Sequence, residues 1–236
     1  MSTTSTDTDV RSRIAIALDV PTLDEATRLA DAVAGSIGVA KIGLQLFSAA
    51  GPAAVEVMRQ RGFDVLLDLK LHDIPNTVAG AAREIGRMGV RYVTSHTQGG
   101  EAMLRAAVDG LAEGADEAGL AAPRVLAVTV LTSDTEASPQ VLTERVGIAA
   151  AAGCGVVCAA PDLATVKAAA PSIFALVPGI RLADGERHDQ SRVATPTSAI
   201  AAGADLLVLG RAVSGASDPA AAAAIVADEV RRASMT

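Results

Sequence analysis

The chain has 236 residues, of which half are hydrophobic and a fifth are charged, and its formal net charge is -7. This length allows one large domain with a sizeable core. The acidic balance argues against broad nucleic-acid binding, which needs a basic surface. The longest apolar stretches are of strand length or are broken by Gly and charged residues, so we expect no membrane segment. The N-terminus lacks the basic start and apolar run of a secretion signal. We therefore expect a cytoplasmic protein whose residues 1–12 form a disordered tail.

Short runs rich in Val, Ile and Leu recur along the chain. Their nearly continuous apolar residues are typical of strands that are buried on both faces. Ala-rich segments with helical spacing lie between the runs, and several of them end at a Gly just before the next run. We expect strands within residues 13–19, 38–44, 63–71, 90–96, 124–131, 153–160, 173–179 and 205–210, and helices within segments such as 23–37, 51–62, 76–89, 99–114 and 218–234.

This alternation predicts a parallel sheet with helices outside it. Eight strand–helix units within residues 13–236 favour a single (β/α)8 TIM barrel, an α/β fold, as the catalytic domain. The alternative is an open doubly wound sheet, but no Gly-x-Gly-x-x-Gly follows the first run. Active sites of (β/α)8 barrels lie at the C-terminal ends of the strands, so the residues that end the runs are candidate site residues. They are Asp19, Lys41, Asp68 with Lys70, His96, Thr132, Pro178 with Arg181, and Gly210 with Arg211.

Residues 64–77, DVLLDLKLHDIPNT, place charges at the end of an apolar strand. Successive strand side chains point to opposite faces, so Asp68 and Lys70 share the face that meets the barrel mouth, where Lys41 can join them. Asp73 begins the following loop, and it could instead cap the next helix in a purely structural arrangement. However, buried ion pairs often do not recover their desolvation cost. We therefore interpret the cluster as one that meets charge on a substrate.

A second pattern points to phosphate. The run VLGRAV ends a strand in Gly210 and Arg211 and then enters a helical region. Barrels often bind phosphate with the loops after strands 7 and 8, where Gly allows close backbone approach and Arg pairs with the phosphate oxygens. The polar stretch over residues 181–192 is either an ordinary solvated loop or a lid whose Arg181 and Gln190 reach the same phosphate.

With these residues identified, the sequence resembles the orotidine 5'-phosphate decarboxylase family over residues 13–232. Asp-x-Lys-x-x-Asp is specific to the wider superfamily, and its extension to His-Asp-Ile-Pro-Asn-Thr, together with Lys41, is specific to this family. The resemblance implies decarboxylation of orotidine 5'-phosphate to UMP and CO2, the last step of pyrimidine nucleotide synthesis, without a cofactor or a metal. The motifs that carry it are ALDV, KIGLQLF, DLKLHDIPNT, LTS, VPGIR, DQSR and LVLGRAV, in the family's order.

The resemblance also implies roles for the matched residues. Asp68, Lys70 and Asp73 correspond to the catalytic Asp-Lys-Asp, Lys41 completes the charge array, and Lys70 donates the proton to C6. In that family Asp73, Ile74 and Thr77 come from the neighbouring subunit, which implies a homodimer with shared sites. The implied substrate contacts are Asp19, Lys41, Asp73 and Thr77 at the ribose, Thr132 at the pyrimidine ring, Ile74 and Pro178 as apolar wall, and Arg181, Gln190, Gly210 and Arg211 at the phosphate.

Two other functions compete with this interpretation. The 3-keto-gulonate-phosphate decarboxylases and hexulose-phosphate synthases resemble the same barrels but use magnesium, and they typically carry Glu at the position of Lys41. A lysine there would repel the cation. A catalytically inactive barrel that binds a nucleotide would keep Gln190 and Arg211 but could lose the charged cluster. This chain retains Asp68, Lys70 and Asp73.

Overall fold

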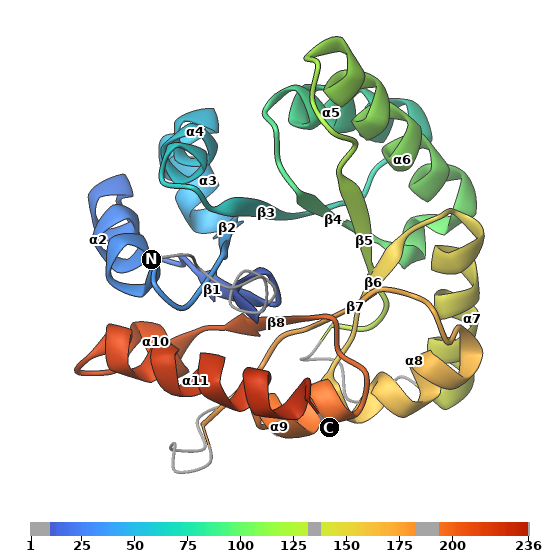
Figure 1. The fold of residues 1–236 in the computed structure, drawn as a ribbon. Coiled ribbons are helices and arrows are strands. Elements are labelled where there is room, and N and C mark those ends of the chain that lie inside the picture. Colours follow the sequence, from blue (N-terminus) through green and yellow to red (C-terminus); the bar gives the residue numbers. More distant parts are fainter. Residues whose placement is uncertain (1–9, 132–137, 183–193, 236) are drawn as a thin grey trace.

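The computed structural model describes residues 10–131, 138–182 and 194–235. Within these residues eight parallel strands close into a barrel in chain order, with the first strand paired to both the second and the eighth (Figure 1). The predicted (β/α)8 barrel is confirmed, and the open doubly wound sheet is wrong. The strands are β1 (Ile14–Ala17), β2 (Val39–Gly43), β3 (Asp64–Leu71), β4 (Tyr92–His96), β5 (Arg124–Val128), β6 (Gly155–Val157), β7 (Ala175–Val177) and β8 (Leu206–Leu209).

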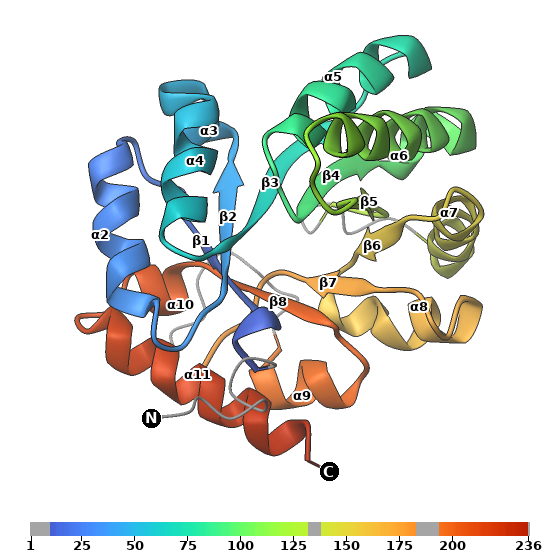
Figure 2. The same cartoon turned by 45° about the horizontal axis from the view of Figure 1, so that its top comes forward.

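Helices surround the barrel, as the helical spacing of the Ala-rich segments predicts (Figure 2). Short 3-10 turns precede two of them, namely η1 (Thr97–Gly99) and η2 (Ala160–Asp162). None of the helices in the described part of the chain has both the length and the apolar character needed to cross a membrane. The helices are α2 (Leu23–Val33), α3 (Leu44–Ala50), α4 (Pro52–Gln60), α5 (Pro75–Arg87), α6 (Gly100–Glu117), α7 (Pro139–Ala151), α8 (Leu163–Ala169), α9 (Pro196–Ala201), α10 (Arg211–Ser214) and α11 (Pro219–Ala233).

Local signals in the sequence explain where several helices begin and end. The side chains of Thr22 and Asp218 accept hydrogen bonds from backbone N–H groups in the first turns of α2 and α11, which satisfies donors that have no partner within the helix. Glycines with positive φ end the helical turns before four of the strands, because this conformation is unfavourable for other residues. They are Gly62, Gly89, Gly153 and Gly203.

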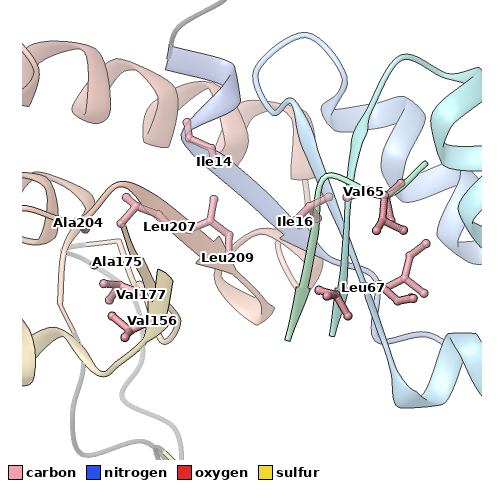
Figure 3. Close-up of a cluster of buried hydrophobic side chains, with 14 of the residues drawn as sticks. Ile14, Ile16, Val65, Leu67, Val156, Ala175, Val177, Ala204, Leu207 and Leu209 are labelled. Carbon is pink, nitrogen blue, oxygen red and sulfur yellow. The ribbon is translucent and has the colours of Figure 1, made fainter. Parts of the chain in front are cut away.

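The strand side chains alternate between two cores. Ile14 and Ile16 of β1 pack outward against the helices, together with side chains such as Leu67, Val177 and Leu209 (Figure 3). The residues between them point into the barrel, where they form a separate cluster that fills its interior. A ligand site must therefore lie at an end of the barrel. The inner cluster consists of Ala15, Ala17, Val39, Leu66, Tyr92, Leu126, Leu176, Leu206 and Val208.

The last residues of the predicted tail are part of the barrel structure. Residues 10–12 form a helical turn, and Val10 is buried in the outer core. The carbonyl oxygen of Arg11 accepts a hydrogen bond of 2.9 Å from the backbone N–H of Gly38. The disordered tail predicted for residues 1–12 is therefore wrong for its last three residues, because an apolar side chain and a backbone hydrogen bond attach them to the barrel. Residues 1–9 lie outside the described residues.

Helices α5 and α6 lie side by side (Figures 1 and 2). Gly114 of α6 lets the two backbones approach, since a Cβ atom there would overlap the carbonyl oxygen of Arg83 on α5. Arg83 also pairs with Glu113 across the two helices. This contact fixes α5, and α5 begins directly after the charged motif of β3.

Candidate active site

A cavity of about 470 Å³ lies at the C-terminal ends of the strands. Its volume is in the range of small-molecule sites, and its floor is made by side chains of the inner core such as Leu66 and Val208. Polar and charged residues that follow or end the strands form its walls. Of the predicted site residues, those that line it are Asp19, Lys41, Asp68, Lys70, Pro178, Arg181, Gly210 and Arg211.

Four of these residues form a chain of alternating charge. The Nζ atom of Lys41 donates a hydrogen bond of 2.8 Å to Oδ1 of Asp19 and lies 3.8 Å from Oδ2 of Asp68. The Nζ atom of Lys70 donates a hydrogen bond of 2.8 Å to Oδ1 of Asp68. Lys41 is only 8% exposed, so its charge is compensated by the two carboxylates rather than by water. The predicted convergence of positions 41, 68 and 70 is present in the structure.

The Asp68 carboxylate is held in its ionised form. Burial raises its pKa, but the charge and hydrogen bond of Lys70, the charge of Lys41 and a hydrogen bond from Thr94 together outweigh that effect, and the pKa lies below its ordinary value. A partly buried carboxylate that remains charged can act electrostatically on a ligand placed beside it.

The end of β3 is irregular where the charged residues lie. Leu67 pairs with Val93 of β4, and Leu71 pairs with Ser95, so three residues of β3 lie opposite the single residue Thr94. Lys70 is the one residue other than glycine in the described part of the chain with a positive φ, at 52°. Such a bulge redirects a side chain, and bulges of this kind are common beside active sites. Asp68 and Lys70 do lie side by side, as the alternation of strand side chains predicts. They do so on an irregular backbone and not on the regular strand that this alternation assumes.

The segments that follow β7 and β8 bring two arginines to the cavity. Arg211 begins α10 directly after Gly210, and Arg181 follows β7. The Nε atom of Arg181 is buried and has no hydrogen-bond partner among the residues that the structure describes. The backbone N–H of Arg181 donates to the carbonyl oxygen of Ala194 at 3.0 Å, which joins the two ends of the polar stretch after β7. Gln190 and Thr132 lie outside the described residues, so their predicted contacts are not placed.

Four of the predicted residues that the structure describes do not line this cavity, and three of them lie at the start of α5. Asp73, Ile74 and Thr77 are exposed at the start of α5, and the side chain of Ile74 is 65% exposed. The Oδ1 atom of Asp73 accepts a hydrogen bond of 2.6 Å from the backbone N–H of Ile74. The structural alternative that makes Asp73 the N-cap of α5 is wrong, because Ile74 occupies the N-cap position and no side chain caps the helix. Pro75 occupies the first turn of this helix.

His96 ends β4 but is not among the cavity-lining residues that the structure describes. Its ring lies 5.5 Å from that of His72, at an interplanar angle of 42°. Burial lowers the pKa of His96, and the neighbouring His72 and Lys70 lower it further. Within the described residues, no group of three or more His, Cys, Asp or Glu side chains is arranged to hold a metal ion.

The chain matches the family described as "Orotidine 5'-phosphate decarboxylase / HUMPS family" over residues 12–226. It belongs to that family. An orotidine 5'-phosphate decarboxylase of Anaeromyxobacter dehalogenans is 47% identical over 228 residues, covering 91% of this chain and 96% of the relative. One from Moorella thermoacetica is 43% identical over 233 residues, covering 93% and 92%. The crystal structure of orotidine 5'-phosphate decarboxylase from Lactobacillus acidophilus, at 30% identity, has a TM-score of 0.76 and covers 92% of this chain and 98% of that one.

Membership of the orotidine 5'-phosphate decarboxylase / HUMPS family confirms the resemblance that the motifs indicate. The strand-end rule nevertheless missed Thr94, which lines the cavity two residues before the end of β4. A signal was available in the sequence. Thr94 is two residues after the inward-facing Tyr92, so its hydroxyl lies on the same face of β4, the face that meets Asp68.

Proposed function

We propose that this chain is a carboxy-lyase that converts orotidine 5'-phosphate to UMP and CO2 without a cofactor. The observation that carries the proposal is the alternating array of Asp19, Lys41, Asp68 and Lys70 in the cavity. The names of the relatives that match nearly the whole chain support the same reaction.

In the proposed mechanism, the substrate carboxylate lies beside the ionised Asp68, and this repulsion disfavours the charged ground state. When the bond between C6 and the carboxylate breaks, CO2 leaves and the bonding electron pair remains on C6. The Lys70 ammonium stabilises this carbanion and then transfers a proton to C6. This step forms UMP and leaves Lys70 as a neutral amine. Lys41 fixes Asp68 and Asp19 in position, and solvent returns the proton to Lys70.

The substrate phosphate is proposed to bind to Arg181, Arg211 and Gly210 together with Gln190. The Nε atom of Arg181 supports this placement, because it is buried without a partner among the described residues, and a buried donor is costly unless another group accepts from it. Contacts far from the reacting carbon provide binding energy that the enzyme can use at the transition state. Pro178 would form apolar wall near the base, and Thr132 would read the pyrimidine ring.

The active protein is proposed to be a homodimer in which Asp73, Ile74 and Thr77 complete the site of the neighbouring subunit. Their position supports this, because all three are exposed and lie outside the cavity of their own chain. Burial of the Ile74 side chain against a second copy would also remove exposed apolar surface from water.

The carboxylates of Asp19 and Asp68 are poorly suited to the magnesium ion that the metal-dependent superfamily reactions need. The Lys41 ammonium lies between the carboxylates of Asp19 and Asp68, at 2.8 and 3.8 Å. It therefore neutralises the same oxygens that a divalent cation would need, and its positive charge would repel the ion.

An ultraviolet assay of orotidine 5'-phosphate consumption, run with and without EDTA, tests the proposal. We expect turnover in both cases and a loss of about 100- to 10,000-fold in Lys70→Ala, the usual contribution of a general acid. Activity that disappears with EDTA and returns with magnesium would favour the metal-dependent reactions. Tight UMP binding without CO2 release in the unmodified protein would identify a nucleotide-binding barrel instead.

A further inference from the structure

Thr94 connects the two charged residues of β3 through one hydroxyl group. Its Oγ1 atom lies 2.9 Å from the backbone nitrogen of Lys70 and 2.9 Å from Oδ1 of Asp68. Thr94 is only 2% exposed, so water competes little for either contact. It is also the single β4 residue that lies opposite the three-residue bulge of β3.

The direction of both hydrogen bonds follows from the chemistry of the groups. The backbone N–H of Lys70 can only donate, so the Thr94 oxygen accepts from it. The hydroxyl has one proton, and the ionised Asp68 carboxylate can only accept. The proton of Thr94 is therefore directed at Asp68, and a single side chain fixes both the carboxylate and the backbone that carries Lys70.

The backbone of Lys70 needs such support. A φ of 52° places a lysine in the left-handed region, where its Cβ atom is crowded. In this conformation the Nζ atom of Lys70 reaches Oδ1 of Asp68, the same oxygen to which Thr94 donates. If the hydroxyl were lost, the N–H of Lys70 would lose its acceptor and the bulge could relax toward regular strand geometry.

We propose that Thr94 is a positioning residue for the decarboxylation, which holds the Asp68 carboxylate and the strained Lys70 backbone in the arrangement from which Lys70 delivers its proton. The inference rests on the proposed roles of Asp68 and Lys70. Thr94 acts through these two residues, and it contributes little to the affinity for the substrate phosphate.

The test compares Thr94→Val, Thr94→Ser and Thr97→Val in the full-length protein, with kcat and KM measured for orotidine 5'-phosphate. Thr97 is a matched control, because it is also a buried threonine, at 1% exposed, and does not line the cavity. Its hydroxyl donates a hydrogen bond of 2.9 Å to the carbonyl oxygen of Val128. We expect Thr94→Val to lower kcat by about 100-fold, the scale of a misplacement of about 1 Å, with KM changed much less. Thr94→Ser should restore most of kcat, and Thr97→Val should keep it.

Several outcomes would overturn the inference. One is a kcat for Thr94→Val equal to that of the unmodified protein, and another is an equal loss in Thr94→Ser and Thr94→Val. If Thr94→Val does not fold, Thr94→Ala removes the same hydroxyl and leaves room for the backbone to relax. Failure of both to fold while Thr97→Val folds would make Thr94 a structural residue only. Lys70→Ala distinguishes failure of the proposed function from failure of the role of Thr94. If Lys70→Ala stays active, the proposed function fails. If Lys70→Ala is inactive while Thr94→Val is fully active, only the role of Thr94 fails.

Discussion

The Lys41 ammonium and the Asp19 carboxylate form a hydrogen-bonded pair of 2.8 Å between neighbouring strands of the barrel. Gly43, at the end of β2, leaves the space that this pair occupies. A Cβ atom at Gly43 would lie 2.7 Å from Oδ1 of Asp19 and 3.2 Å from Nζ of Lys41. The charge array therefore depends on a residue that carries no charge itself.

Gly43→Ala should displace the Asp19 side chain and weaken the array without unfolding the protein. The φ of Gly43 is -90°, which any residue can adopt, and the Asp19 side chain is half exposed and free to move. We expect kcat/KM to fall by about tenfold, which corresponds to about 1.4 kcal/mol of lost transition-state stabilisation. Gly147→Ala on α7 is the control, because its new Cβ would meet nothing within 4 Å. Equal steady-state kinetics in the two variants would contradict the prediction.

The pH dependence of stability should reveal the pairing of Asp68. Its pKa is lowered from 3.8, so the ionised carboxylate contributes stability that is present above pH 3.8 and is lost as the pH falls through the folded-state pKa. Lys70→Ala removes the largest influences that lower this pKa and leaves the burial that raises it. The difference in Tm between the unmodified protein and Lys70→Ala should therefore widen as the pH rises from about 3 to about 6. A constant difference over this range would show that Lys70 does not stabilise the charged Asp68.

Arg211 should discriminate a phosphorylated ligand from an unphosphorylated one. If its guanidinium binds the phosphate, the unmodified protein will bind UMP much more tightly than uridine, and Arg211→Ala will remove most of that preference. We expect UMP affinity to fall by about 10- to 100-fold, in line with 1.5–3 kcal/mol for a hydrogen bond to a charged group, while uridine affinity stays nearly constant. Isothermal titration calorimetry measures both. A parallel loss for the two ligands would place Arg211 outside the phosphate site.

Much of this architecture follows from the sequence, because the apolar runs of β1 to β8 are nearly continuous. The charges of Lys41 and Asp68 stand out within two of these runs, and that of Asp19 follows a third. The bulge opposite Thr94 does not follow from it, since strand register depends on pairing between β3 and β4 rather than on the composition of either strand. The positive φ of Lys70 is hidden for the same reason: nothing about a lysine indicates a left-handed backbone.

The attachment of Val10 and Arg11 to the barrel does not follow from the sequence either. The preceding stretch is polar, and a single apolar residue gives no periodic signal of its own. Its burial is decided by the outer core and by the hydrogen bond from Gly38 to Arg11, which joins parts of the chain that are distant in sequence.

Complementation between two inactive variants tests the shared site. If Asp73 acts in the neighbouring subunit, a dimer that combines Lys70→Ala with Asp73→Ala has one site with both substitutions and one site that is fully intact. Mixing the two inactive variants under conditions that exchange subunits should therefore restore about a quarter of the unmodified activity, because half of the dimers are mixed and each carries one working site. A mixture of Lys70→Ala with Lys70→Ala/Asp73→Ala is the control and should stay inactive. Absence of recovery, with subunit exchange verified by native mass spectrometry, would place Asp73 in the site of its own chain or outside the site altogether.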